Sequence, residues 1–481
     1  MPRLCIFLFF GLCMCQPGLA QVHYSLESGG VAGYATQTPF WLRARQHGIV
    51  PSDGSFATLR ATFRKDYKND TTHYKRRFEW GLGGMAVANF PIKTKHSPPQ
   101  FLWPEGYAKL RWRWVELYAG RWHQVQGLGD STLTSGFVAW SDNALPMPKV
   151  HLQTRGFVPL QWWGQFLAFN VGYAHGWFTV PYIKKAYLHQ KYFYVRLGKP
   201  HHTLHFYTGL NHQVIWGGQA DYLKGSDFAV NGQLPATWLD YVTVVTGRYP
   251  DALSSSRYTA FDGTNRIGNH LGSIDVALQY RLPNAQWLFY HQHLYEDASG
   301  LAFQNFPDGL TGLQFKNLRK GSVQLKSMVL EFLTTTHQSG RIFDPAARFQ
   351  GADNYFNHGQ YTEGWSYRGQ SLGTPFLSPH FYLLADGIGF FPNNRVKVGH
   401  WGSSVGLSKN VSLTTLFSYS HNLGTFSHTF SPAIGQLSAL LSAQITFSRW
   451  SGGVLTASYA LDTGDLYPRV TGGYLSLKKN W

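Results

Sequence analysis

Long stretches of the chain alternate between apolar and polar residues. In residues 274–282 every even position is apolar, while the odd positions include Asp275 and Arg281. The same period of two runs through residues 204–216, 411–419 and 437–447. Alternate side chains of an extended strand point to opposite faces. Strands of about nine to thirteen residues with one apolar face are long for a soluble sheet, and they suit a tilted crossing of a membrane.

The connections between these stretches fall into two sizes. Tight turns are predicted at residues 283–285, 408–410 and 451–453. Long polar segments lie near residues 124–160, 217–240, 247–270, 296–320 and 337–395. Short turns at one end and long loops at the other are typical of outer-membrane barrels. At roughly 25 residues for a strand and its share of loops, the chain has room for about 18 strands.

The first twenty residues predict a cleaved signal peptide. Arg3 is followed by an apolar run over residues 4–15, and small residues precede Gln21. We expect cleavage after Ala20, which leaves residues 21–481 as a single domain. Lipid attachment at Cys15 is disfavoured because the residues before this cysteine are not small.

The last ten residues predict a terminal strand with an aromatic end. Leu475, Leu477 and Trp481 share one parity and would face the same way, although Lys479 interrupts this face. A final strand that ends in an aromatic residue is the pattern of bacterial outer-membrane barrels.

Composition excludes several other classes of protein. All three cysteines lie within residues 1–20, so the mature chain has no disulfides, zinc–thiolate sites or cysteine nucleophiles. Beyond that segment there is no run of eighteen apolar residues, which excludes helical membrane spans. No internal repeat supports a soluble β-helix or propeller. The predicted fold is therefore all-β: a transmembrane outer-membrane antiparallel β-barrel of about 18 strands, with a small helical or loop plug as a further possibility.

The chain is strongly basic, with a net charge of +17 that falls to +16 when Arg3 leaves with the signal. Such a charge favours anionic partners: acidic polysaccharide, lipopolysaccharide phosphates or nucleic acid. Export makes nucleic acid the weakest of the three, and we expect none. We expect the protein to be a monomer. Besides an anionic polysaccharide or lipopolysaccharide, we expect it to contact outer-membrane lipid.

Residues 107–114 combine cations with tryptophans. On a strand, Lys109, Arg111 and Arg113 would face the lumen, and Trp112 and Trp114 would face lipid. The functional interpretation is a positive inner wall that attracts acidic sugar or phosphate. The equally weighted alternative is a lumen in which these cations pair with Asp and Glu from neighbouring strands.

The stretch 338–395 is the densest polar and aromatic region. Sugars bind by stacking on aromatic rings, with planar polar groups hydrogen-bonding their hydroxyls. Its composition also suits a long loop folded into the barrel. We predict ring or cationic contacts from Tyr355, Trp365, Tyr367 and Arg368. We predict hydroxyl contacts from Asp353, Asn354 and Glu363.

Enzymatic and metal sites are not supported by the sequence. Residues 369–373 and 402–406 match the nucleophile-elbow pattern, but neither lies in a strand-to-helix turn of an α/β sheet. His291 and His293 would share a strand face, yet no third metal ligand is visible. Asp344, Asp353 and Glu363 could supply the acid and base carboxyl groups of a glycosidase only if folding placed two of them at a suitable distance, which the sequence does not show. We expect no catalysis, no metal and no cofactor.

Several short motifs together resemble one family. They are Thr38–Leu42, Val214–Gly218, Tyr295–Gly300, Asp308–Gly312, Asp353–His358, Gly364–Gly369 and Asn393–Val396. In order and spread they are similar to the capsule assembly protein Wzi family, in the form common in Bacteroidetes-type genomes. The resemblance implies an 18-stranded outer-membrane lectin that helps retain capsular polysaccharide, with periplasmic helical elements as a plug. It supplies no ligand-binding residues.

The sequence therefore predicts an outer-membrane lectin-like barrel that binds anionic capsular or other surface polysaccharide. Two alternatives stay open. An anion-selective porin or uptake channel needs an open lumen. An outer-membrane partner in secretion or surface assembly would show a large apolar patch on its rim.

Overall fold

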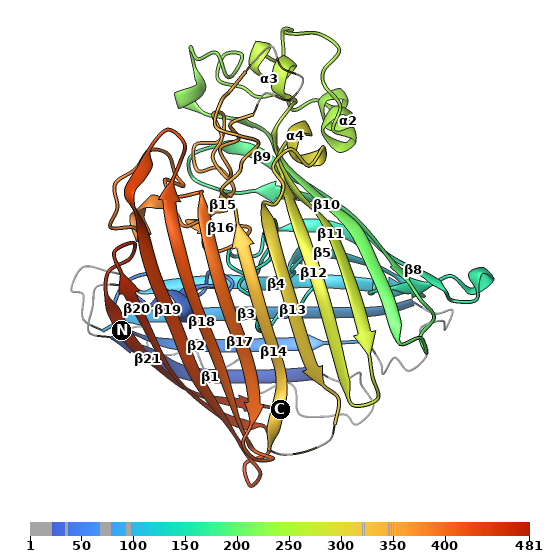
Figure 1. Ribbon diagram of the computed structural model, residues 1–481, viewed down its shortest axis with the longest axis vertical. Coiled ribbons are helices and arrows are strands. Elements are labelled where there is room, and N and C mark those ends of the chain that lie inside the picture. The colour runs from blue at the N-terminus through green and yellow to red at the C-terminus, as the bar shows by residue number, and fades with distance from the viewer. Residues whose placement is uncertain are drawn as a thin grey trace, which may run out of the picture.

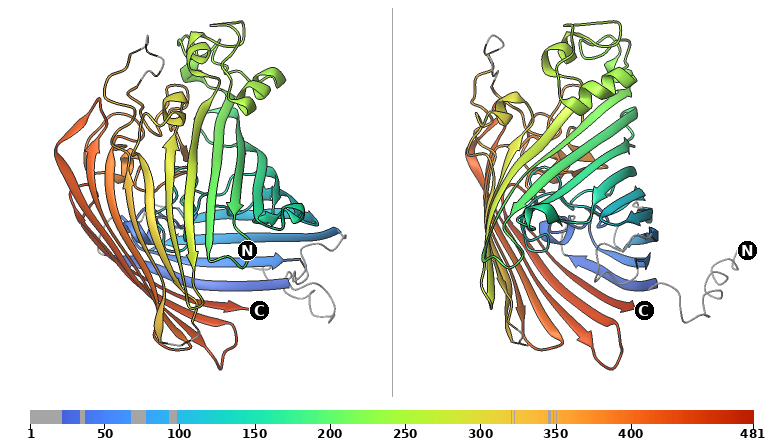
Figure 2. Two further views of the ribbon diagram at one scale, coloured as in Figure 1. Left: turned by 45° about the vertical axis from the view of Figure 1, so that its right-hand side comes forward. Right: turned by 90° about the vertical axis from the view of Figure 1, so that its right-hand side faces the viewer.

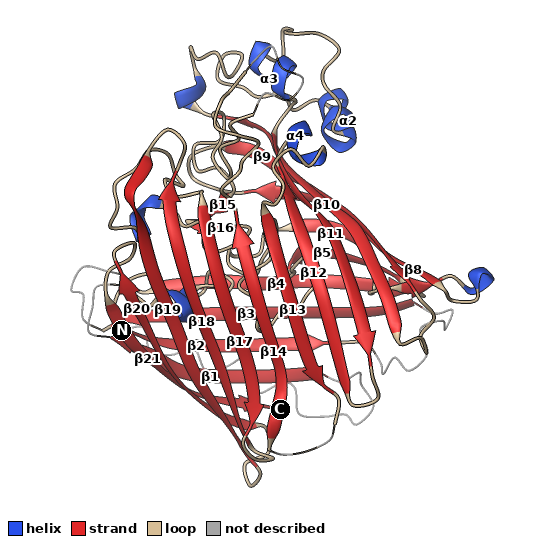
Figure 3. Cartoon of the chain, in the orientation of Figure 1, coloured by secondary structure: helices blue, strands red, loops and turns tan. Residues whose placement is uncertain are grey.

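The computed structural model describes residues 22–33, 37–67, 78–92, 98–319, 321, 323–344, 347, 349 and 351–481. The predicted signal peptide, residues 1–20, lies outside the described residues. Strands form nearly all of the wall, and helices α2–α4 gather at one rim (Figures 1 and 3).

The first ten strands are β1 (Val22–Gly33), β2 (Phe56–Lys65), β3 (Phe78–Pro91), β4 (Gln100–Trp112), β5 (Val115–Arg121), β6 (Lys149–Thr154), β7 (Val158–Pro159), β8 (Leu167–Phe178), β9 (Lys184–Leu197) and β10 (Leu204–Gln219). The later strands are β11 (Asn269–Arg281), β12 (Ala285–Tyr295), β13 (Gly309–Asn317), β14 (Gln324–Thr334), β15 (Ser366–Tyr367), β16 (Gln370–Ser371), β17 (Val396–Gly406), β18 (Val411–Gly424), β19 (Thr429–Phe447), β20 (Gly453–Gly464) and β21 (Val470–Asn480). The helices are α1 (Phe40–Arg43), α2 (Trp238–Thr246), α3 (Ala260–Asn265) and α4 (Ala298–Leu301), with 3₁₀ turns η1 (Gln161–Trp163), η2 (Asp221–Leu223) and η3 (His380–Tyr382).

The sheet closes on itself into a barrel. Each strand pairs antiparallel with its neighbour, and β1 pairs with β21 from Ser25 opposite Asn480 to Gly33 opposite Gly472. In Figure 2 the blue N-terminal strands meet the red C-terminal strands. Both β6 and β7 pair with β8, so they are two parts of one interrupted strand. The wall is thus a closed barrel of 18 strands, which confirms the predicted fold class and strand count.

The alternating pattern determines which side chains face out. In β11, Val276, Leu278 and Tyr280 are exposed on the outer surface, whereas Ser273, Asp275 and Ala277 are buried inside. In β21, Leu475 and Leu477 face outward, as does the adjoining Trp481, and all three are exposed. In these stretches of β11 and β21 the apolar face therefore meets lipid and the polar face meets the interior, as the sequence predicted.

The predicted tight turns and the predicted long connections lie at opposite rims of the barrel, although some of their limits differ. The tight turns 282–284, 407–410 and 448–452 lie at the rim that holds the C-terminal end of β21. The long connections at the other rim are residues 34–55, 122–148, 220–268, 296–308 and 335–395.

Two predicted loop limits were wrong. The predicted loops 124–160 and 296–320 each included a strand, β6 and β13 respectively. Their alternation is short, and Gly309 and Gly312 weaken it in β13. The predicted loops at 217–240 and 247–270 are a single connection, residues 220–268, which carries α2 and α3, and their outer ends belong to β10 and β11.

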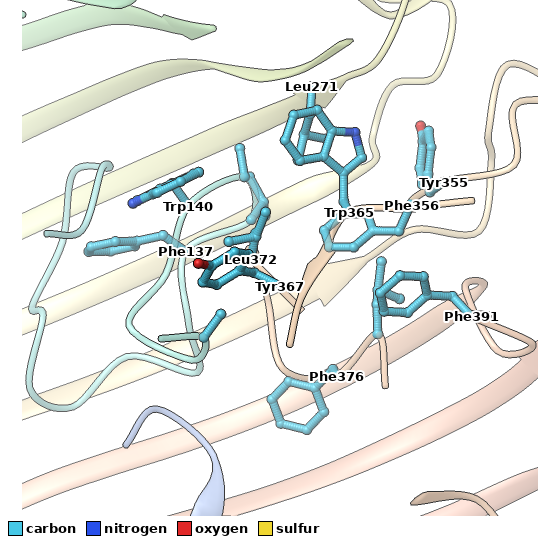
Figure 4. Packing of buried hydrophobic residues seen from close by; sticks show 14 of the residues in the cluster. Phe137, Trp140, Leu271, Tyr355, Phe356, Trp365, Tyr367, Leu372, Phe376 and Phe391 are labelled. Carbon is cyan, nitrogen blue, oxygen red and sulfur yellow. The ribbon is translucent and has the colours of Figure 1, made fainter. Parts of the chain in front are cut away.

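The barrel interior is filled by folded loops. Residues 37–55, residues 122–148 and the described residues of 335–395 form a plug that packs against inward side chains such as Leu271, Leu310 and Val398. Figure 4 shows Phe137, Trp140, Trp365 and Tyr367 among the residues of this buried cluster. The one-turn helix α1 contacts β19 and β20 from inside. The plug is therefore built mainly of loops, whereas the resemblance implied periplasmic helices. No helix in the described part of the chain is long and apolar enough to span a membrane.

Candidate functional site

Buried polar groups fasten the plug to the barrel wall. Glu331, on the inner face of β14, accepts hydrogen bonds from Thr134 Oγ1 at 2.6 Å and the Ser135 amide at 2.5 Å. Tyr290 of β12 donates a third hydrogen bond to the same carboxylate. All of these residues are buried, so the carboxylate replaces water for three donors.

A second polar centre joins two parts of the plug. The Arg45 guanidinium contacts both carboxylate oxygens of Asp142, at 2.9 and 3.0 Å, and donates to the Thr134 carbonyl at 2.6 Å. A fork-shaped guanidinium on a carboxylate is a strong and directional contact. The plug is therefore a folded unit with its own internal bonds.

The three aromatic residues predicted to stack on sugar belong to this plug. Tyr355, Trp365 and Tyr367 are fully buried in the hydrophobic cluster. The Tyr355 hydroxyl accepts from Asn305 at 2.6 Å and donates to Asp308 at 3.1 Å. None of the three rings has a face open to a ligand, so the predicted stacking contacts do not fit this structure. The reason is that these three rings pack into the hydrophobic cluster inside the barrel.

Asp353 and Asn354 stabilise the same segment. Asp353 Oδ2 accepts from Ser339 Oγ at 2.7 Å and from Ser299 Oγ at 3.3 Å. Asn354 Oδ1 accepts from Asn394 at 2.6 Å and from Asn357 at 3.0 Å. These contacts hold the loop in place, in contrast to the predicted hydroxyl contacts with a ligand.

Asp353 makes the stability of this segment depend on pH. Burial, with the nearby Asp297 carboxylate as a second cause, raises the pKa of Asp353 to about 7. A raised folded-state pKa gives a contribution that is complete below the unfolded value near 4 and is lost as pH rises through about 7. We expect Asp353→Asn to be more stable than the wild type at about pH 8 and equal to it near pH 4. The difference in urea midpoint between variant and wild type, measured at both pH values, checks this; an equal difference at both would contradict it.

The predicted lumen cations are neutralised by partners. Lys109 and Arg111 face inward from β4 and are buried. Lys109 Nζ lies 2.6 Å from Asp66 Oδ1, and Arg111 pairs with Glu79 of β3. This is the paired arrangement that the sequence left as the alternative, and it leaves little net positive field at these two residues.

Arg113 does not share their face. Strand β4 ends at Trp112, and Arg113 lies in the turn to β5 with φ at +55°. The predicted three-cation wall is wrong at this position because the strand is one residue too short. The Arg113 guanidinium instead lies 5.2 Å from the Trp112 ring.

A pocket opens at the rim of the long connections, between the plug and the β8–β9 tip. It has a volume of about 830 Å³. Two of the predicted ligand residues, Glu363 and Arg368, line it together with Lys184 and Lys185. The plug contributes the aromatic residues Phe381, which is half exposed, and Phe390. Strands β8 and β9 contribute Trp177, Phe178 and Tyr187.

The charge of this pocket is predominantly positive. Lys184, Lys185 and Arg368 are exposed, and none of them forms an ion pair within the described part of the chain. Glu363 is half-buried, and burial raises its pKa above the ordinary value. Three cations beside exposed aromatic carbon suit an anionic sugar, because charge attracts the acid and the rings cover the C–H faces of the sugar.

Sequence reasoning missed most of this pocket. Lys184 and Lys185 lie about 180 residues before Arg368 in the chain, and only folding brings them together. The available signal was a lysine pair at the tip of a hairpin, next to an aromatic-rich segment at 177–182. Phe381 and Phe390 lie within the predicted loop 337–395 but were not predicted as ligand contacts.

Metal ligation and a nucleophile elbow find no support in the geometry. Among the described residues, no three His, Cys, Asp or Glu side chains are grouped so that they could hold a metal ion. Ser371 lies in the two-residue strand β16, buried and bonded to the Thr374 carbonyl, and residues 402–406 are part of β17.

The sequence profile of the capsule assembly protein Wzi family matches residues 56–380. This chain belongs to that family. The match runs from β2 through most of the wall and plug, and it confirms the resemblance seen in the short motifs. No curated protein sequence matches the chain.

Three solved structures are similar to this chain, and the Wzi structure shares its fold. Wzi of Escherichia coli is 15% identical, with a TM-score of 0.60 over 94% of this chain and 83% of that one. OccAB2 of Acinetobacter baumannii is 10% identical, with a TM-score of 0.48 over 96% and 97% of the two chains. OccK3 (OpdO) of Pseudomonas aeruginosa is 10% identical, with a TM-score of 0.47 over 96% and 95%. The Wzi-family chain is thus an outer-membrane-type barrel.

Proposed function

We propose that this protein is a non-enzymatic outer-membrane lectin that binds anionic capsular polysaccharide and helps retain or assemble it at the cell surface. Membership of the capsule assembly protein Wzi family supports this role. The Escherichia coli relative is an outer-membrane protein involved in group 1 capsule assembly and a carbohydrate-binding β-barrel. The observation that carries the proposal for this chain is the cationic and aromatic pocket above a closed plug.

The plug argues against the channel alternative. A porin needs a continuous aqueous path, whereas the upper lumen here is packed with buried aromatic side chains. A lectin needs no such path. The pocket lies at the rim of the long connections, where a polymer outside the cell can reach it, and a rim-bound acidic chain would also lie close to lipopolysaccharide phosphates.

Two measurements test this function. In a deletion strain we expect polysaccharide to be made but shed, with cell-bound polymer restored by the intact gene. Purified barrel should bind the isolated acidic polymer. Unchanged attachment in the deletion strain would contradict the proposal, and single-channel conductance of the purified barrel would then test the channel alternative.

Glu363 provides a pH test of the pocket. Because burial raises its pKa above the ordinary value, Glu363 takes up a proton at a higher pH than a free glutamate does, and the pocket then becomes more positive. We expect wild-type binding of an acidic polymer to strengthen as pH falls from about 8 to about 4, just below the ordinary pKa of glutamate. Glu363→Gln keeps a hydrogen-bonding group without the charge. It should bind roughly two- to five-fold more tightly at pH 8, with a flatter pH profile.

Titration of both proteins with the polymer, by calorimetry at the two pH values, measures this effect. Asp465→Asn is the matched control because Asp465 is exposed and lies outside the pocket. Weaker binding by Glu363→Gln at both pH values would contradict the electrostatic role and would favour a direct hydroxyl contact.

A further inference from the structure

The outer wall of β8–β12 carries polar side chains where lipid-facing residues are normally apolar. Strand pairing places these polar side chains on the same outer face as the exposed Phe193 of β9, Val276 of β11 and Phe289 of β12. The set comprises His175, His189, Lys191, His212, His270, His291 and His293. Imidazole and ammonium groups placed in hydrocarbon are costly. This part of the wall therefore needs a cover.

Helix α2 covers the polar wall over β8–β10. The Tyr241 ring lies 5.6 Å from the His175 ring and 5.9 Å from the His189 ring, and its hydroxyl bonds to Tyr173 at 2.7 Å. Lys191 donates to the carbonyl of Val245, at the end of the helix. Thr237 caps the other end through a reciprocal pair of bonds with Asp240. The helix is therefore fixed against the outside of the barrel.

Residues 298–306 cover the polar wall over β12 in the same way. His293 Nε2 lies 2.9 Å from the Gly300 carbonyl, and the Phe303 ring is 4.5 Å from the His293 ring. Phe306 lies 6.1 Å from His291. We call residues 237–249 and 298–306 together the outer cover. Its helices stand beside the upper ends of β10–β12 in Figure 1.

The side of the outer cover that faces away from the barrel is apolar. Trp238 is 73% exposed and Leu239 67%, and Val242 lies on the same helical side, opposite the buried Val244. Phe306 is 61% exposed, and Phe303 and Leu301 are also exposed. Two separate segments thus present large apolar side chains outward, with Arg248 exposed just after α2. An exposed apolar patch of this kind marks an interface.

This apolar surface continues the lipid-facing wall. Lys191, which holds the end of α2, pairs across the sheet with Tyr173, and Tyr173 pairs with Leu152 of β6. Leu152 is 50% exposed on the outer wall, and Phe193 follows two residues below Lys191 on β9. The end of α2 therefore lies next to side chains that meet lipid.

From this geometry we propose that the outer cover lies in the interfacial layer of the outer leaflet, with Trp238, Leu239 and Phe306 inserted among lipid chains. Short amphipathic helices with tryptophan on the apolar side bind this layer, and a cation at the helix end suits lipid phosphate. The outer cover thereby separates the polar wall from lipid and sets the depth of the barrel beneath the plug.

Spin labels on single cysteines test the insertion. Residues 21–481 contain no cysteine, so labels placed at Trp238→Cys and Phe306→Cys report one site each. The barrel is reconstituted in vesicles of phosphatidylcholine and phosphatidylglycerol. Leu278→Cys on the exposed wall is the lipid control, and Thr264→Cys on exposed α3 is the aqueous control at the same rim.

The rates at which each label collides with oxygen and with a water-soluble nickel chelate show whether the label lies in lipid or in water. We expect labels at 238 and 306 to favour oxygen several-fold over the chelate, as at Leu278. Values like those at Thr264 would place the outer cover in water and overturn the proposal. Low collision rates with both reagents would mean that another protein, either a second copy of this chain or an assembly partner, covers the patch. That result would also overturn the proposal.

Discussion

Glu331→Ala is expected to release the plug from the barrel wall and to lower the free energy of unfolding by about 3–5 kcal/mol. The Glu331 carboxylate accepts from Thr134, Ser135 and Tyr290 in a buried site. Its removal leaves all three donors without a partner, and a buried donor that loses its acceptor costs more than the bond itself contributed. Two of the three donors belong to the segment 122–148, so the loss falls on the contact between plug and wall.

Urea unfolding followed by tryptophan fluorescence measures this loss. Glu331→Gln keeps the volume and one acceptor oxygen and should show an intermediate loss. Asp465→Ala removes an exposed carboxylate whose partner, Arg469, is also exposed, and it should change stability by less than about 0.5 kcal/mol.

The same variant has a second readout. Because the plug fills the upper lumen, its release should raise the ion conductance of the barrel in planar bilayers. If Glu331→Ala unfolds at the wild-type urea concentration and conducts no more than the wild type, the plug is not held by this carboxylate.

The second large effect is expected at the rim pocket. The triple variant Lys184→Ala, Lys185→Ala, Arg368→Ala should bind an acidic polysaccharide roughly 10- to 100-fold more weakly at low salt. The three cations line one pocket and are exposed, so their fields add at a bound acid group. Added salt should narrow the difference, since the screening length falls to about 10 Å at 0.1 M.

Calorimetric titration of the polymer measures this effect. Lys409→Ala is the matched control, because Lys409 is exposed in a tight turn at the opposite rim. A neutral polysaccharide should show little difference between the proteins. If the triple variant and the Lys409 variant bind the acidic polymer equally, the pocket is not the binding site.

The period-two pattern was sufficient to predict the wall of the barrel. In residues 274–280 and 475–477, alternate side chains face lipid and the interior, and the polarity of the residues shows which face is which. This pattern is local and does not depend on residues far away in the chain. The strand count was predicted from the length of the chain at roughly 25 residues for a strand and its share of loops. The pairing of β1 with β21 shows that the sheet is closed. The same local argument failed for Arg113, because a turn that begins one residue early changes which face a side chain occupies.

The site was less predictable because it depends on which residues folding buries. Aromatic and amide residues in 338–395 have the composition of a sugar site and also of a packed loop. The structure shows that Tyr355, Trp365 and Tyr367 are core residues, while Glu363 and Arg368, from the same stretch, line the pocket. Composition cannot separate these cases, since burial is decided by the surface against which the loop packs.

The sequence by itself determined the membrane barrel, its basic charge and its family, because these depend on local pattern and on motifs along the chain. Only the tertiary structure decided that Lys109 and Arg111 are paired with acids, that folded loops pack inside the barrel, and that Lys184 and Lys185 line one pocket with Arg368. The tertiary structure also decided that the outward-facing histidines of β8–β12 lie beneath the outer cover. Each of these outcomes rests on contacts between residues far apart in the chain, and such contacts exist only once the barrel has closed and the long loops have packed against it.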